Sequence, residues 1–99
     1  MRAMVLRRAG PVETSPLESR EIDVPAIGND EILARVDACG VCRTDLHVVE
    51  GQLLNPKKLV VPGHEIVGTV VKVGNNVTRF SEGDLVGIPW LHSTCGRCE

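Results

Sequence analysis

Three short segments of this chain combine cysteine, histidine and carboxylate side chains at spacings that suit metal binding. They are residues 39–47 (CGVCRTDLH), residues 63–68 (GHEIVG) and residues 95–98 (CGRC). Thiolate sulfur and imidazole nitrogen are donors that zinc prefers, and a Cys-x-x-Cys pair is a common source of two of them. The sequence therefore predicts zinc binding.

The two Cys-x-x-Cys pairs offer one way to build a zinc site, as a stand-alone structural module with four cysteine ligands. However, 52 residues lie between Cys42 and Cys95, whereas about 15–20 separate the pairs of such modules. This arrangement also leaves the Gly-His-Glu of residues 63–65 without a role. We keep it as the alternative hypothesis.

The same segments resemble the motifs of the zinc-dependent medium-chain alcohol dehydrogenases, in particular the bacterial propanol-preferring type. The resemblance covers nearly the whole chain and rests on residues 42–47, on the glycine and histidine pattern of residues 63–77, and on Pro-Trp-Leu (89–91) before the last cysteine pair. It implies a mainly β, GroES-like fold, an irregular barrel or sandwich with one short helix. Residues 1–99 would form the N-terminal part of the catalytic domain.

The resemblance implies two metal sites. Cys42 and His64 would bind the catalytic zinc together with a third cysteine beyond residue 99. Asp45 would accept the other ring N–H of His64, and Glu65 would lie just behind the metal. Cys39 would be a small buried residue and no ligand.

The second site is the structural zinc, of which the chain carries only a part. Cys95 and Cys98 would be the first two of its four ligands. Because two thiols alone bind zinc poorly, we expect exposed, oxidisable thiols in this chain.

The resemblance also implies how protons and cofactor are handled. Thr44 and His47 would relay the alcohol proton, with His47 reached through the cofactor ribose, and Arg43 would contact the cofactor pyrophosphate. As alternatives, Thr44 is only a helix cap and His47 a surface residue. Trp90 would form a wall of the substrate pocket, or else a core residue. Leu53, at a position where ethanol-type relatives carry tryptophan, predicts a roomier pocket for longer or aromatic primary alcohols.

The implied activity is the interconversion of alcohols with aldehydes or ketones, using zinc and NAD(P). No Gly-x-Gly-x-x-Gly occurs in the chain, so we expect the Rossmann domain to lie outside it and the 99 residues alone to be inactive. The full-length enzyme is expected to be a homo-oligomer. A zinc-free, quinone-reductase-like relative is a further alternative, disfavoured because the cysteines and His64 are present.

Composition excludes several other functions. The 99 residues are 42% hydrophobic with a net charge of −2, which argues against nucleic-acid binding because no basic stripe exists. We find no export signal and no membrane span. Four cysteines without such a signal indicate a reducing compartment, and we expect a cytoplasmic protein.

The positioning elements are expected to be strands and one helix. Strands are predicted at Ala3 to Arg7, Leu17 to Val24, around Ile32–Ala34–Val36, at Ile66 to Val73 and at Asp84 to Ile88, from alternation and β-branched content. A loop is expected at 11–16 and turns at 28–30 and 74–76, the latter of hairpin type. The helix is predicted at Thr44 to Glu50, capped by Thr44 and ended by Gly51.

Overall fold

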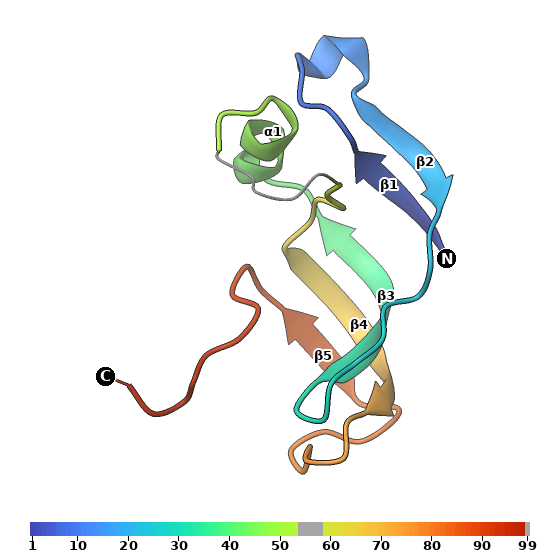
Figure 1. Cartoon of the computed structure of the whole chain (residues 1–99), viewed down its shortest axis with the longest axis vertical. Coiled ribbons are helices and arrows are strands. Elements are labelled where there is room, and N and C mark those ends of the chain that lie inside the picture. The colour runs from blue at the N-terminus through green and yellow to red at the C-terminus, as the bar shows by residue number, and fades with distance from the viewer. Residues whose placement is uncertain (54–58, 99) are drawn as a thin grey trace. The chain divides into compact units, whose positions relative to one another are not determined.

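The computed structural model describes residues 1–53 and 59–98, which form two compact units (Figure 1). The first unit contains residues 1–24 and 41–63, and the second contains residues 25–40 and 64–99. In chain order the elements are β1 (Arg2–Leu6), a 3-10 helix (Val12–Thr14), β2 (Leu17–Glu21), β3 (Ile32–Gly40), α1 (Arg43–Val49), β4 (Glu65–Val73) and β5 (Leu85–Ile88).

The first unit contains the two-stranded antiparallel sheet, the 3-10 helix and α1. β1 pairs with β2 along its whole length, from Arg2 opposite Glu21 to Leu6 opposite Leu17. Leu6 also exchanges backbone hydrogen bonds with Val60, at 2.7 and 3.1 Å. The side chains of Val5, Leu6 and Val49 are buried, so apolar residues from β1 and α1 supply the core of this unit.

α1 begins at Arg43, one residue before the predicted start at Thr44. Its N-cap residue is Cys42 rather than Thr44. Cys42 has extended backbone angles, and its Sγ accepts the backbone N–H of Thr44. Thr44 is already the second residue of α1, so the prediction of a threonine cap is wrong. Gly51, with φ of +79°, follows the C-cap residue Glu50, as expected for a glycine that ends a helix.

The second unit is a three-stranded antiparallel sheet in the order β3-β4-β5, visible as adjacent arrows in Figure 1. The β3–β4 ladder runs from Ile32 opposite Val73 to Gly40 opposite Glu65. Two register shifts interrupt it, between Leu33 and Ala34 and between Val36 and Ala38. Such bulges bend the strands and increase their local twist.

The two predicted turns of this unit lie side by side at one end of the ladder. The N–H of Gly74 donates to the carbonyl of Glu31, and that of Asn76 donates to Asn29. The N–H of Val77 donates to the carbonyl of Gly74 at 3.1 Å, so the predicted turn at 74–76 is confirmed. It is not a tight two-residue hairpin, because residues 74–84 together connect β4 to its antiparallel neighbour β5. Through the hydrogen bonds to Glu31 and Asn29, the 74–76 turn is also joined to the 28–30 turn.

The strand predictions were correct in number and approximate position. β2 ends at Glu21 rather than Val24, and part of the expected 11–16 loop is a 3-10 helix. β3 continues to Gly40, and Val36, expected on the covered face, is 57% exposed. Its partner across the ladder is Gly68, which has no side chain to pack against Val36. The mainly β class with one short helix is confirmed, and the sheets are open.

Across the described residues, no helix has the length and apolar character needed to cross a membrane.

Candidate metal centre

The register of the β3–β4 ladder brings two of the predicted ligands together. Gly40, the last residue of β3, pairs with Glu65, the first residue of β4. Cys42 follows Gly40 by two residues, and His64 directly precedes Glu65. Consecutive Cα atoms are about 3.8 Å apart, so this pairing keeps Cys42 and His64 close although 21 residues separate them in sequence.

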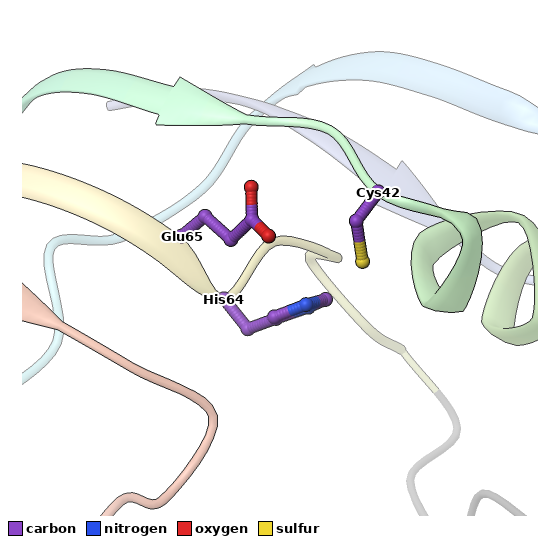
Figure 2. Close-up of side chains that lie close together, drawn as sticks. All are labelled: Cys42, His64 and Glu65. Atoms are coloured by element: carbon purple, nitrogen blue, oxygen red, sulfur yellow. The ribbon is translucent and has the colours of Figure 1, made fainter.

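The side chains of Cys42, His64 and Glu65 form one cluster of metal-ligand types (Figure 2). Their donor atoms, a thiol sulfur, a ring nitrogen and a carboxylate oxygen, all lie within 4.8 Å of one another. Cys42 and His64 are half-buried, whereas Glu65 is exposed. The structure thus assembles three residues that the sequence analysis placed at the catalytic metal.

The chemistry of this donor set suits zinc. Sulfur, imidazole nitrogen and carboxylate oxygen are its usual protein ligands, at about 2.3 Å for sulfur and 2.0–2.2 Å for nitrogen and oxygen. Ligands on a tetrahedral ion with these bond lengths lie about 3.5 Å apart. Because the observed donors lie within 4.8 Å of one another, small side-chain movements would let them share one ion.

The position of Cys42 is fixed by a capping box at the start of α1. The N–H of Thr44 donates to the Cys42 Sγ at 3.3 Å, while the N–H of Cys42 donates to the Asp45 Oδ2 at 2.9 Å. Asp45 is 9% exposed, so this carboxylate is held inside the protein. Asp45 therefore orients the backbone of Cys42, while its predicted bond to the ring of His64 stays a prediction.

His64 has an aromatic neighbour. The ring of Trp90 meets that of His64 edge to face, with centroids 5.1 Å apart and planes at 73°. Trp90 is 60% exposed, so the alternative that it is a core residue is wrong. Its predicted place beside the metal ligand matches this geometry.

Cys39 differs from the expectation for it. It lies in the last part of β3 and is exposed rather than buried, because the described part of the chain leaves its side of the strand uncovered. Its Sγ is 3.5 Å from the carbonyl oxygen of Gly40. The metal-ligand cluster contains Cys42 and no second thiol, so the structure does not pair Cys39 with Cys42 in a common site.

Cys95 and Cys98 lie on an exposed segment without regular secondary structure. Their sulfur atoms are 3.0 Å apart, and Cys95 Sγ also accepts the N–H of Arg97 and of Cys98. The hydrogen bond from Cys98, aided by these backbone N–H groups, lowers the pKa of Cys95 to about 7. Within residues 1–53 and 59–98, this pair joins no cluster of three or more ligand side chains.

The remaining predicted residues lie on or just after α1. Arg43 is its exposed first residue, and Thr44 and His47 are half-buried and three positions apart, a spacing that places side chains on neighbouring positions of a helix surface. Leu53 is 41% exposed.

The sequence analysis missed Gln52. Its Oε1 contacts the Nδ1 of His47, and its backbone N–H donates to the His47 carbonyl. No motif marks this glutamine, because its contact depends on the chain turning back after α1 at Gly51.

Comparisons with known proteins agree with these observations. Residues 28–99 match the model of the alcohol dehydrogenase GroES-like domain. The "Probable alcohol dehydrogenase AdhA" of Mycobacterium tuberculosis is 50% identical over 104 aligned positions, covering 100% of this chain and 30% of that protein. This chain thus spans 30% of the length of that curated relative.

Solved structures show the same fold. A thermostable alcohol dehydrogenase from Pyrobaculum aerophilum with cobalt and zinc bound matches with a TM-score of 0.87 and 34% identity, over 99% of this chain and 28% of that one. A protein described as a zinc-binding dehydrogenase from Sinorhizobium meliloti, bound to NADP, matches with a TM-score of 0.78 and 34% identity, over 98% and 26%.

Proposed function

The chain belongs to the alcohol dehydrogenase GroES-like domain family, and we infer that the full-length protein is a zinc-dependent, NAD(P)-linked alcohol dehydrogenase. The observation that carries this proposal is the cluster of Cys42, His64 and Glu65. The metal-bound and NADP-bound relatives support both cofactors. The reaction would interconvert an alcohol and its aldehyde or ketone.

In this proposal Cys42 and His64 hold the catalytic zinc, together with a cysteine from beyond residue 99. When bound, zinc supplies a Lewis acid that lowers the pKa of an alcohol, and NAD(P) supplies the hydride acceptor. Glu65 places a negative charge beside the cation. The capping box around Cys42 keeps its sulfur in one orientation, which reduces the entropy lost on binding.

Thr44 and His47 would carry the alcohol proton away from the site. A hydroxyl both accepts and donates a hydrogen bond, so Thr44 can pass on a proton without holding a charge. His47 would be the next group in this relay. The contact of its Nδ1 with Gln52 orients the ring, which leaves Nε2 as the nitrogen that exchanges protons. Arg43, exposed at the start of α1, would bind the cofactor pyrophosphate through its planar guanidinium.

Trp90 and Leu53 would shape the substrate pocket. An aliphatic side chain at position 53 leaves more room than a tryptophan, so we propose longer or aromatic primary alcohols as substrates. The measurement is kcat/KM of the full-length protein along the series from ethanol to hexanol. We expect a rise with chain length, and a steady decline would contradict the pocket assignment.

The metal assignment is tested by single substitutions in the full-length protein. We expect Cys42→Ser and His64→Ala to lower zinc affinity by at least about 100-fold, because each removes a direct ligand and outer-shell changes alone cost 10–100-fold. Alcohol oxidation should be lost in parallel. Zinc content by atomic emission and a competition titration with a chromophoric chelator are the measurements.

Cys39→Ser is the matched control, since it changes an exposed thiol three residues away. It should leave zinc and activity unchanged. Loss of metal in Cys39→Ser would instead support the four-cysteine structural module, and a full-length protein without bound zinc would support a zinc-free reductase.

A further inference from the structure

Gly40 lies against the carboxylate of the metal cluster. It ends β3 directly opposite Glu65. A Cβ atom at position 40 would lie 2.5 Å from the Glu65 Oε2, 3.3 Å from its Cβ and 3.6 Å from its Cδ. The carboxylate therefore occupies the space that any other residue at position 40 would fill.

Two other glycines of the same sheet show that this contact is specific to Gly40. At Gly68 an added Cβ would meet the backbone oxygen of Arg35 at 2.6 Å, so that glycine serves the close approach of two strands. At Gly87, in β5, nothing lies within 4 Å of an added Cβ. In this comparison, only Gly40 makes room for a side chain of the metal cluster.

We propose that Gly40 is a positioning residue for metal binding, because its missing side chain lets the Glu65 carboxylate lie beside Cys42 and His64. This inference rests on the proposed function, in which that cluster binds zinc. The nearest atom to an added methyl group is the free end of a flexible side chain. An alanine at position 40 would thus move the carboxylate and leave the β3–β4 pairing in place.

Displacing the carboxylate weakens cation binding through charge. A carboxylate within 4.8 Å of the other two donors attracts a divalent ion over a distance shorter than the Debye length of about 8–10 Å, so dissolved salt screens the attraction little. Moving the carboxylate away lengthens that distance and weakens the attraction. Gly40 therefore affects metal binding only through the position of the Glu65 carboxylate and is not itself a ligand.

The test is a double-mutant cycle on the full-length protein, read out by Co²⁺ and Zn²⁺ binding rather than by activity. Gly40→Ala should weaken zinc binding by about 10-fold, a typical effect for an outer-shell change. Glu65→Ala should weaken it by a similar factor. Gly40→Ala added to Glu65→Ala should cause no further loss, because the group that the methyl displaces is already gone.

Gly87→Ala is the control, as a strand glycine with open space around it, and it should bind metal like the parent protein. The Co²⁺ absorption bands add a second readout, since they shift when the carboxylate near the ion moves. Circular dichroism should show unchanged folding in all four variants.

An equal loss from Gly40→Ala with and without the Glu65 carboxylate would overturn the inference, as would unchanged binding in Gly40→Ala alone. Those outcomes leave the proposed function standing if Cys42→Ser and His64→Ala still abolish binding. A parent protein that binds neither metal would overturn both proposals.

Discussion

The two thiol-bearing regions of this molecule differ in what fixes their sulfur atoms. Cys42 caps a helix, its backbone N–H is held by the buried Asp45, and its neighbours in the cluster come from the start of β4. Cys95 and Cys98 lie on an exposed segment and contact mainly each other and their own backbone. Spacing in the sequence suggests a metal for both regions.

This difference shows what a motif needs beyond residue type. A metal site requires several donors at about 2–2.3 Å from one point, and only elements with fixed register can hold donors from distant parts of the chain together. The ladder between β3 and β4 does this for the first region. The second region has two donors on one loop, and its hydrogen bonds are all local.

The largest expected effect is on the support of Cys42. Asp45→Ala removes the side-chain acceptor of the Cys42 N–H and with it one half of the capping box, which should cost about 1 kcal/mol of stability, as the loss of a helix cap does. With Cys42 loosened, zinc affinity should fall about 10-fold. Urea denaturation of the metal-free protein and a zinc competition titration give the two values.

Asp45→Asn retains an oxygen acceptor and serves as the control. Its stability and its zinc affinity should both fall less than those of Asp45→Ala. If Asp45→Ala changed neither stability nor affinity, the contrast between a supported and an unsupported sulfur would disappear.

An intermediate effect is expected on the reactivity of Cys95. Cys98→Ala removes the largest cause of its lowered pKa, so the pKa should rise from about 7 toward the usual 9.0. At pH 7 the thiolate fraction then falls, and alkylation by iodoacetamide should slow several-fold. In Cys98→Ala, raising the pH should restore the alkylation rate of Cys95 that the parent protein shows at pH 7.

The measurement is mass spectrometry of alkylated peptides in the presence of a chelator, over a range of pH. Cys42 is half-buried whereas Cys95 is exposed, so Cys42 should react more slowly than Cys95 in the same sample. Equal rates at the two cysteines would remove the distinction between the regions.

The smallest effect concerns Asp37, on the ladder that supports the first region. Thr69 donates to its Oδ2 at 2.6 Å, and this bond, with smaller contributions from Arg35, lowers the pKa of Asp37. Thr69→Val should raise that pKa toward its usual value, which is measurable by NMR titration of the carboxyl carbon. An unchanged pKa would indicate that the strands do not hold this cross-strand bond in solution.

The sign of the accompanying pH effect follows from linkage. Because the folded pKa is lowered, Asp37 favours the folded state above its unfolded pKa, and this contribution is lost as the pH falls through the folded value. Thr69→Val should therefore weaken the acid dependence of stability.

The sequence was sufficient for the elements, and it singled out two candidate ligands that the structure brings close together. The β-branched run that starts at Ile66 identifies β4, because such residues pack well on a pleated surface. The spacing of Asp45 and Gly51 indicates a short helix, because aspartate favours the first turn of a helix and glycine favours the position just after its last turn. Cys42 and His64 were chosen by resemblance, and the structure brings them together.

Details that depend on cross-strand partners could not be predicted. A thiol as N-cap is not among the preferred caps, so Thr44 was chosen in place of Cys42. Neither the glycine opposite Val36 nor the register shift between Val36 and Ala38 is visible in the sequence of β3 alone, so Val36 was expected on the covered face and Cys39 in the core. Gly40 acquires its role only from the pairing with Glu65.

The pairing of Gly40 with Glu65 has a consequence for how the protein folds. Gly40 and Glu65 pair although 24 residues lie between them in the sequence, and closing a loop of that length costs about 3 kcal/mol of chain entropy. A zinc ion that binds only the closed form returns about 2.7 kcal/mol at a free concentration 100 times its Kd, so it nearly offsets that cost. If the proposed site binds zinc during synthesis, the ion would hold the two ends of this loop together, and metal starvation would lower the yield of folded protein before any substrate is encountered.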